Sequence, residues 1–487
     1  MRAPQIDRSA PRRRRSTLAL LAAACLAVAC LDGRGSAEPS RLPNIIFVLA
    51  DDLGYGDLGC YGQKKIQTPH IDRLAAEGIR FTQHYSGNAV CAPSRCCLMT
   101  GKHPGHAHIR DNSEVKPEGQ RPIPASSVTI AMLLKDRGYA TAATGKWGLG
   151  APGSEGDPIR QGFDLFFGYN CQRHAHNYYP TYLWRNNERM ALAGNTAGVT
   201  GKHYSHDLIE AEALRFIDEN RSRPFLLYVP FTIPHLALQV PEDSLRQYVG
   251  KWDDPPYDGS RGYQPQPHPR AAYAAMITRM DRSVGRILQR VAQWGLDRDT
   301  IVFFTSDNGP THDKVGGSDS DFFASAGPLR GLKGSLYEGG IRVPMIARWP
   351  GKIAPGRTTD LPSAFWDVLP TLCEVSGARP PADIDGISFL PTLLGQGEQA
   401  RHEFLYWEFP GYGGQQAIRS GDWKAVRRNL HRMNAAAELY NLADDPAEAA
   451  DVAKRRPDVV ARLDRLMVEN RTPSAAFPFK ALDKRAR

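Results

Sequence analysis

The chain has 487 residues, of which 41% are hydrophobic and 23% are charged, with 61 Lys and Arg against 52 Asp and Glu. These ordinary values exclude a wholly disordered chain, a collagen-like chain and a small disulfide-stapled scaffold, and the length suits one large domain with a smaller one, or two to three average ones. The formal net charge of +9 would favour a nucleic-acid partner only if it were spread over a folded surface.

About half of that charge lies at the start of the chain. Seven arginines against two aspartates give residues 1–37 a charge of +5. Four of these arginines, at 12–15, precede an apolar run at 18–29 that is too short for a comfortable membrane span and is followed by small residues. The pattern predicts a signal peptide over residues 1–37 and export to the periplasm or the extracellular space. The charge left to the mature chain is too dilute to indicate nucleic acid.

The same segment resembles a bacterial lipobox at residues 27–30, in which Cys30 would carry the lipid. An uncleaved anchor is the remaining alternative. No other stretch approaches 18 apolar residues, so no transmembrane span is expected in the mature chain.

Removal of the signal peptide would reduce eight cysteines to six. An oxidising compartment favours paired cysteines, but the adjacent Cys96 and Cys97 are awkward for bridges, and the spacings match no zinc site. The six are Cys60, Cys91, Cys96, Cys97, Cys171 and Cys373.

From residue 44 onward, predicted strands alternate with predicted helices. Continuous apolar runs of strand length suit parallel strands that are buried on both faces, and the alternation predicts an α/β fold with a doubly wound sheet. The strands are expected at 44–50, 79–81, 139–144, 225–231, 300–305 and 342–349, and the helices at 68–77, 94–100, 130–136 and 271–294.

The end of the chain has a different pattern. Short antiparallel strands are expected at 403–409, 416–420 and 423–427, followed by a helix over 445–470. We therefore expect a catalytic domain over 41–397 and a smaller α+β subdomain over 398–487. Two insertion-like stretches, 150–200 and 241–270, are long enough to be functional or disordered loops.

Polar side chains follow two of the predicted strands. Asp51 and Asp52 follow the first strand, and Asp307 and Asn308 follow the strand at 300–305. In open α/β sheets the ligand crevice lies beyond the carboxyl ends of the strands, and a set of carboxylates with an amide oxygen suits calcium or magnesium. A helix cap or a tight turn is the alternative for each group taken alone.

The segment 88–112 is the densest in chemistry. Cys91 would lie at the N-terminus of a helix, where backbone N–H groups favour an anion, and Arg95 follows one turn later. On spacing alone, Cys91 could be a thiolate nucleophile. The alternative is a packed cysteine beside a solvated arginine.

The run Cys91-Ala92-Pro93-Ser94-Arg95, followed by Leu98, Thr100 and Gly101, matches a specific motif. Through this motif the chain resembles the type I sulfatases of the alkaline phosphatase superfamily. The resemblance covers nearly the whole mature chain and implies an alkaline-phosphatase-like doubly wound mixed sheet flanked by helices. It also implies that a formylglycine-generating enzyme oxidises Cys91 to formylglycine. The further matching segments are NIIFVLADDLGYGDLG, TGKWGLG, Pro234-His235, TSDNG, GSLYEGGIRVP, RSGDWKA and ELYNLADDP.

The resemblance implies one calcium ion and a set of catalytic groups. The hydrated formylglycine would attack the sulfur of a sulfate ester, and Arg95 would stabilise that hydrate. Lys146 and Lys333 would hold the sulfate oxygens, and His235 would protonate the leaving alkoxide. The calcium ligands would be Asp51, Asp52, Asp307, Asn308 and the modified Cys91.

These roles agree with the chemistry of the reaction. A sulfate monoester has a poor alkoxide leaving group, so a general acid contributes strongly. The charge that develops on the sulfate oxygens requires cations placed in advance. Taken singly, Lys146 and Lys333 would be solvated lysines and His235 a loop histidine.

One position departs from the family pattern. Family members usually read Gly-Lys-x-His, whereas this chain has Gly148 in place of the histidine. We hypothesise that His174 or His176, from the stretch CQRHAHNYYP, compensates. Ordinary loop histidines are the alternative.

Loops around the crevice are expected to select the substrate. His174, His176, Arg110 and Asn112 are the candidate contacts, with His103, His106 and Asp111 nearby, and such side chains suit sugar hydroxyls. A sulfated carbohydrate is therefore the expected partner, ahead of small aryl sulfates. Two other functions compete: a phosphatase or phosphonate hydrolase of the same fold, and an inactive surface-binding homologue.

Overall fold

The computed structural model describes residues 41–116, 119–432 and 436–483, which belong to one compact unit, 41–487. The predicted signal peptide and Cys30 lie outside the described residues. Within the described part, no helix combines the length and the apolar character needed to cross a membrane.

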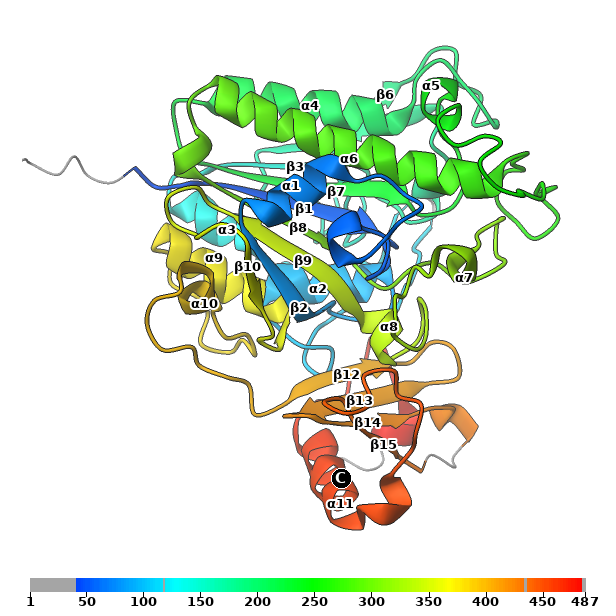
Figure 1. Ribbon diagram of the computed structural model, residues 1–487. Coiled ribbons are helices and arrows are strands. Elements are labelled where there is room, and N and C mark those ends of the chain that lie inside the picture. The colour runs from blue at the N-terminus through cyan, green and yellow to red at the C-terminus, as the bar shows by residue number, and fades with distance from the viewer. Residues whose placement is uncertain (1–40, 117–118, 433–435, 484–487) are drawn as a thin grey trace, which may run out of the picture. The chain divides into compact units, whose positions relative to one another are not determined.

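A mixed sheet of eleven strands forms the centre of this unit (Figure 1). Its order is β10-β2-β9-β8-β1-β7-β3-β4-β5-β6, with β11 paired to β2. The run β8-β1-β7-β3-β4 is parallel, whereas β9 is antiparallel to both β8 and β2. The strands are β1 (Asn44–Asp51), β2 (Ile79–Tyr85), β3 (Ala140–Lys146), β4 (Leu165–Tyr169), β5 (Tyr182–Arg185), β6 (Glu188–Ala191), β7 (Phe225–Pro234), β8 (Thr300–Ser306), β9 (Arg342–Arg348), β10 (Arg357–Thr359) and β11 (Ser363–Ala364).

The central strands β1, β7 and β8 are buried on both faces, which is why they are continuously apolar. Along β1, Ile45 and Phe47 enter one hydrophobic core, whereas Ile46 and Val48 enter the other. The first core also holds side chains of α2 (Cys91–Thr100), α3 (Ile130–Asp136) and α9 (Val368–Ser376). The second holds those of α1 (Pro69–Ala76), α4 (Ser205–Asn220) and α6 (Pro269–Gln293). The predicted doubly wound mixed α/β fold is therefore confirmed.

A second sheet lies near the end of the chain. It has the order β12-β13-β14-β15 and is antiparallel throughout, and α11 packs on it through Leu463 and Met467. Because residues 41–487 form one unit by their contacts, the boundary at 398 stays a prediction. The elements are β12 (Leu405–Phe409), β13 (Gln415–Ser420), β14 (Trp423–Arg427), β15 (Glu438–Asn441) and α11 (Pro457–Glu469).

Two helix boundaries differ from the sequence prediction. α2 begins at Cys91 rather than Ser94, because Pro93 in the first turn needs no hydrogen bond for its missing N–H. The helix predicted over 445–470 is wrong in its first half, since the chain turns there and α11 begins only at Pro457. The sequence did not predict α4, α9, β15, or β4 to β6 inside the stretch 150–200. The remaining short helices are α5 (Glu242–Leu245), α7 (Ser320–Phe323), α8 (Glu338–Ile341), α10 (Leu390–Leu394) and α12 (Lys480–Asp483).

Candidate active site

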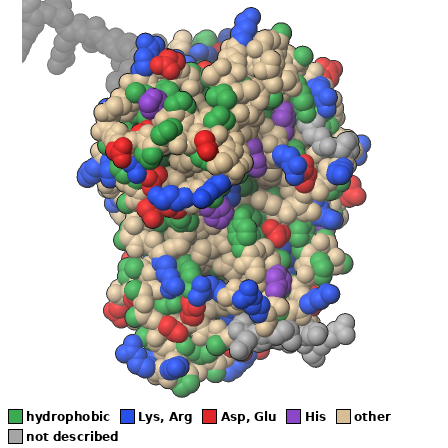
Figure 2. Space-filling model, turned by 90° about the vertical axis from the view of Figure 1, so that its right-hand side faces the viewer, with side chains coloured by type: hydrophobic (Ala, Val, Ile, Leu, Met, Phe, Trp, Pro, Cys, Tyr) green, Lys and Arg blue, Asp and Glu red, His purple; other side chains and the backbone are tan. Residues whose placement is uncertain are grey.

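The carboxyl ends of four neighbouring parallel strands bring the predicted site residues together. Asp51 ends β1, Lys146 ends β3, and Asp307 directly follows β8. In the register of the sheet Asp51 pairs with Pro234 at the end of β7, so His235 follows at the same edge. This edge faces right in Figure 1 and belongs to the face seen in Figure 2, on which histidine, Lys and Arg side chains gather.

Three cationic side chains pair with three buried carboxylates. Lys146 Nζ lies 2.6 Å from Asp51 Oδ2, and Lys333 Nζ lies 2.8 Å from Asp52. Arg95 Nη2 lies 2.7 Å from Asp307 Oδ2. Burial opposes ionisation, yet the neighbouring lysines and His235 hold the pKa values of Asp51 and Asp52 below the usual range. The charges of the site therefore balance before any ligand binds.

The pKa of Asp307 moves in the opposite direction. Burial and the nearby Asp51 carboxylate raise it to about 6, against the attraction of Arg95 and Lys146. Three carboxylates packed this closely repel one another, and a divalent cation between them would relieve that repulsion.

The side chain of Asn308 shows whether the residues at this place fit a metal ion. Its Nδ2 donates to Asp52 Oδ1 at 2.8 Å, while its buried Oδ1 has no hydrogen-bond partner among the described residues. Ligand atoms of Asp51, Asp52, Cys91 and His235 lie within 4.8 Å of one another. An unpaired amide oxygen beside carboxylates is a donor set that fits a hard divalent cation.

Cys91 begins α2 and faces this cluster. Its Sγ lies 3.6 Å from Asp51 Oδ1 and 3.6 Å from Lys333 Nζ, and the residue is 2% exposed. Burial raises the pKa of the thiol to about 12, although Lys146 and Lys333 oppose the shift. An unmodified Cys91 is then protonated at neutral pH, which disfavours a thiolate nucleophile.

Arg95 and Asn112 fix the first turns of α2. Arg95 donates from Nε and Nη2 to Asp307 and from Nη1 to the Lys146 carbonyl, which ties the helix to the ends of β8 and β3. The Oδ1 of Asn112 accepts the N–H of Ala92 at 3.0 Å, so this predicted substrate contact lies at the helix N-terminus. The expected contact between Arg95 and residue 91 stays a prediction.

His235 is oriented by its own loop. Its Nδ1 lies 2.5 Å from the Leu236 carbonyl, which can only accept, so Nδ1 carries the proton and Nε2 faces Asp52 at 3.6 Å. Burial, followed by the charge of Lys333, lowers the pKa of His235 to about 4. The ring of His176 stacks on it, with centroids 4.6 Å apart and planes at 15°.

Two other predicted substrate residues lie elsewhere. His174 packs against the rings of Tyr169 and Tyr182, at centroid distances of 4.9 and 4.4 Å. Arg110 is buried and donates to Glu408 at 2.6 Å and to the Thr472 carbonyl at 2.8 Å. The guanidinium is held inside an ion pair with the C-terminal sheet, a geometry that gives no support to the prediction that Arg110 contacts substrate.

A second cluster holds His103, His106 and Asp385. The Nδ1 of His103 accepts the N–H of Gly105 at 3.1 Å, so its Nε2 carries the proton and has no free lone pair for a metal. His106 Nδ1 lies 2.9 Å from Asp385, and the carboxylate also accepts the His103 N–H. This cluster therefore stabilises a loop, and the expectation that these histidines contact substrate finds no support in it.

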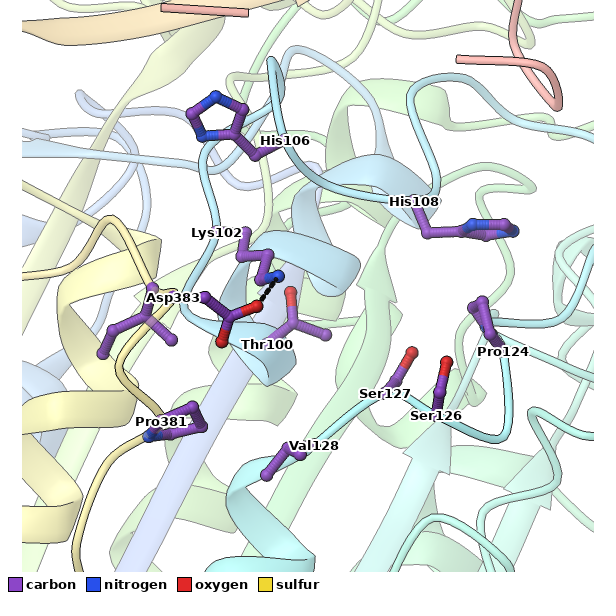
Figure 3. Close-up of a pocket in the computed structure, with 11 residues that line it drawn as sticks. Thr100, Lys102, His106, His108, Pro124, Ser126, Ser127, Val128, Pro381 and Asp383 are labelled. Atoms are coloured by element: carbon purple, nitrogen blue, oxygen red, sulfur yellow. Dashed lines mark hydrogen bonds and ion pairs between the residues drawn. The ribbon is translucent and has the colours of Figure 1, made fainter. Parts of the chain in front are cut away.

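A pocket of about 200 Å³ lies next to that loop (Figure 3). In its wall Lys102 pairs with Asp383, with 2.6 Å between Nζ and Oδ2. Its lining includes Thr100, the last residue of α2, whereas Cys91 lies at the other end of that helix. The pocket contains none of the charged pairs described above and is distinct from the candidate active site.

Some residues near the site carry weak sequence signals. The ring centroids of Tyr263 and His176 lie 5.4 Å apart, and those of Tyr412 and His312 lie 5.5 Å apart. Gln172 lies within the histidine-rich stretch but lacks the residue type that marks acid–base chemistry. Gln172 becomes a candidate functional residue only through its position in the fold.

The cysteines that the structure describes are all unpaired: Cys60, Cys91, Cys96, Cys97, Cys171 and Cys373. Paired cysteines, which an oxidising compartment would favour, are therefore not found in this part of the chain.

Comparison with known families gives the protein its place. A family model described as Sulfatase matches residues 43–378, and one described as N-sulphoglucosamine sulphohydrolase, C-terminal, matches residues 332–472. The chain belongs to the sulfatase family. It is an enzyme that hydrolyses sulfate esters, and a metal site is typical of this family.

Named relatives of this sulfatase align over most of its length. Mouse (Mus musculus) steryl-sulfatase is 34% identical and covers 85% of this chain and 76% of its own. Human (Homo sapiens) arylsulfatase A is 33% identical and covers 90% of both chains. The crystal structure of Ps i-CgsB has a TM-score of 0.76 and 28% identity, covering 89% of this chain and 94% of its own.

The competing phosphonate hydrolase function has weaker support. The phosphonate monoester hydrolase of Agrobacterium radiobacter is 21% identical, with a TM-score of 0.62, and covers 88% of this sulfatase and 95% of its own chain. That likeness shows a shared fold only.

Proposed function

We propose that this sulfatase works with a formylglycine made from Cys91 and with one calcium ion, and that its substrate is a sulfated carbohydrate. The observation that carries the proposal is the set of side chains gathered at the carboxyl ends of the parallel strands. There Cys91, at the start of α2, meets three carboxylates, an unpaired amide oxygen and two lysines.

Asp51, Asp52, Asp307 and Asn308 are the proposed calcium ligands, together with the modified residue 91. The bound ion would supply positive charge to the sulfate oxygens, and the hydrated aldehyde would supply the attacking hydroxyl. The three cationic side chains already neutralise the three carboxylates, so a bound calcium ion would leave the site with a net positive charge. That charge would attract an anionic sulfate ester.

The side chains have separate tasks in this proposal. Lys146 and Lys333 hold the sulfate oxygens from two sides of the cluster, and Arg95 keeps Asp307 and the end of β3 in place. His235 turns Nε2 toward the cluster while Nδ1 keeps its proton; the negative charge of a bound sulfate ester favours a second proton on Nε2, which the ring would then donate to the leaving alkoxide.

Aromatic side chains at the opening support a carbohydrate substrate. Tyr412 is 62% exposed and packs against His312 and beside Gly334, the residue after Lys333. A ring of this kind can stack on a sugar. In its complex with k-i-k-neocarrahexaose, Ps i-CgsB has a TM-score of 0.76 and 27% identity to this chain, covering 91% of this chain and 97% of its own.

Maturation and location complete the proposal. A formylglycine-generating enzyme is the proposed partner for residue 91. The pattern of residues 1–37 supports export to the periplasm or the extracellular space, with lipidation at Cys30 as the alternative to simple cleavage.

Mass spectrometry of the peptide that contains Cys91, after co-expression with the modifying enzyme, tests the proposal together with sulfate release from sulfated oligosaccharides. We expect the aldehyde and its hydrate, and activity that a chelator removes and calcium restores. An unmodified Cys91 in a fully active enzyme would overturn the formylglycine proposal. Aldehyde without any sulfate release would favour an inactive surface-binding homologue.

A further inference from the structure

Two amide side chains at the end of β4 are buried without partners. Asn170 is fully buried and Gln172 is 8% exposed. Neither the nitrogen nor the oxygen of either amide has a hydrogen-bond partner among the described residues. A buried amide left unpaired is costly, so such groups in a folded protein call for a ligand or an ordered water.

The fold places these amides beside the strand edge that carries the site. β4 runs parallel to β3, with Tyr169 paired to Lys146, so Asn170 follows at the same edge. Two residues after Lys146, the N–H of Gly148 donates to the Asn170 carbonyl at 3.2 Å.

Gly148 leaves room for the Gln172 amide. A Cβ at position 148 would lie 2.6 Å from Gln172 Nε2 and 3.8 Å from Arg95 Cδ. The amide therefore fills the space that a side chain at 148 would occupy, next to Arg95 and two residues from Lys146.

The other side of the same loop approaches the start of α2. Cys171 Sγ lies 3.8 Å from Glu114 Oε1, and Asn112, two residues before Glu114, accepts the N–H of Ala92. The loop that carries Gln172 thus lies beside both the segment that caps the cysteine-bearing helix and the end of the lysine-bearing strand.

We propose that the Gln172 amide is a sulfate-binding group of this enzyme, with Nε2 donating to an oxygen of the substrate sulfate and Oε1 accepting from a hydroxyl at position 91. A sulfate ester offers acceptors only, so the two unpaired atoms of the amide need both a sulfate oxygen and a hydroxyl. The inference rests on the proposed function for its second contact only.

The test replaces Gln172 with Met, which keeps the length of the side chain and removes both hydrogen-bonding atoms. We expect kcat to fall about 10-fold or more, as when a preorganised donor is removed, with formylglycine content unchanged by mass spectrometry. Because an unpaired amide is also removed, the melting temperature without ligand should rise by about 1–2 °C.

Inorganic sulfate provides a readout that needs no turnover. We expect sulfate to raise the melting temperature of the wild type, and to raise that of Gln172→Met by less. This comparison can be made on protein that retains an unmodified Cys91, because the Nε2 contact does not depend on the aldehyde.

Gln416→Met is the matched control. Gln416 is buried in the C-terminal sheet, and its amide bonds Tyr406, Met467 and Arg427. We expect this variant to melt at a lower temperature while its kcat and its sulfate response stay those of the wild type.

The outcomes separate the two ideas. An active, aldehyde-bearing wild type with unchanged kcat and unchanged sulfate response in Gln172→Met would overturn the Gln172 inference alone. A lower melting temperature for Gln172→Met, like that of the control, would show that the amide is engaged within the protein and would also overturn it. A wild type without aldehyde that is still active would overturn the formylglycine proposal, and the sulfate response would still decide the Nε2 contact.

Discussion

The charged side chains of the site depend on one another. Each of the three buried carboxylates faces one cation at 2.6 to 2.8 Å, and a buried charge that loses its partner costs several kcal/mol. The cations that are proposed to receive sulfate therefore also make it possible to hold the carboxylates in a buried crevice. Changing one of them should therefore alter both the proposed binding of sulfate and local stability.

Replacement of Lys333 should show this double effect. In Lys333→Met we expect kcat/KM for a sulfate ester to fall about 100-fold or more, because one cation beside the sulfate is lost. The melting temperature should fall as well, since Asp52 loses its ion pair. Steady-state kinetics and thermal melts measure the two effects, and Lys352→Met, at an exposed lysine, is the control. A Lys333→Met enzyme with wild-type kcat/KM would contradict the assignment.

His176 lies on the face of the proposed general acid. We expect His176→Ala to lower kcat about 10-fold, because the His235 ring loses the partner that holds it at the cluster. His176→Phe keeps a stacked ring and should recover most of the activity. Kinetics on the three proteins test this, with His174→Ala expected to have a smaller effect. Unchanged turnover in His176→Ala would remove the role that the sequence suggested for it.

At the scale of the elements, burial on both faces of the sheet governs the ionisable groups as well as the apolar ones. His84 in β2 is fully buried, and its Nδ1 lies 2.9 Å from the Ser363 hydroxyl, with no charged partner among the described residues. Burial lowers the pKa of His84 to about 3. His84 therefore stays neutral in the folded state at pH values below 6.5, where the same side chain is protonated in the unfolded chain.

This difference has a definite direction with pH. The stability that neutral His84 preserves is fully present above about pH 6.5 and is lost as the pH falls toward 3, by about 1.4 kcal/mol per pH unit for one proton. His84→Gln cannot take up that proton, so its free energy of unfolding should decline less steeply between pH 6.5 and 4. Denaturant titrations at several pH values measure the slopes. Parallel slopes for the two proteins would contradict the prediction.

The sequence predicted the elements whose pattern is local and missed those set by tertiary contacts. β1, β7 and β8 were predictable because both of their faces are buried, which makes the strands continuously apolar. The polar pairs Asp51-Asp52 and Asp307-Asn308 were predictable because they stand at the carboxyl ends of β1 and β8, where the crevice of an open α/β sheet lies. α4 and β4 lie within or near insertion-like sequence without such a pattern. The partnerless amide of Gln172 depends on the absence of a side chain at Gly148, and Arg110 finds its partner 298 residues away.

At the scale of the whole molecule, buried ion pairs join the C-terminal sheet to the rest. Glu408 of β12 accepts from both Arg110 and Arg471, at 2.6 and 2.7 Å. Lys424 of β14 bonds Glu338 at the start of α8, and Arg419 of β13 bonds the hydroxyl of Tyr85. These contacts explain why residues 41–487 behave as one unit.

Arg110→Ala tests the structural assignment of this arginine. Removing one partner of a buried pair costs about 3–5 kcal/mol, so we expect a clear drop in the melting temperature. The KM of the folded enzyme should change little, because the side chain does not reach the crevice. Arg110→Lys keeps the charge and should be less destabilised. A normal melting temperature with a raised KM would restore the original substrate assignment.

The C-terminal sheet also reaches the opening of the site. Tyr412 lies between β12 and β13 and packs beside Gly334. If its ring supports a sugar, Tyr412→Ala should raise KM about 10-fold for a sulfated oligosaccharide and little for a small aryl sulfate. Tyr412→Phe keeps the ring and should behave as the wild type. An equal loss on both substrates would contradict a role in carbohydrate binding.

The burial of Cys91 implies that its proposed modification would have to precede complete folding of the chain. With 2% of its surface exposed and α2 packed under the sheet, its side chain offers a modifying enzyme almost no access once the chain has closed around it. The proposed oxidation of Cys91 would therefore compete with folding in time. The fraction of active molecules that a cell produces would reflect the ratio of two rates, that of the modifying enzyme and that of chain closure, rather than the stability of the finished protein.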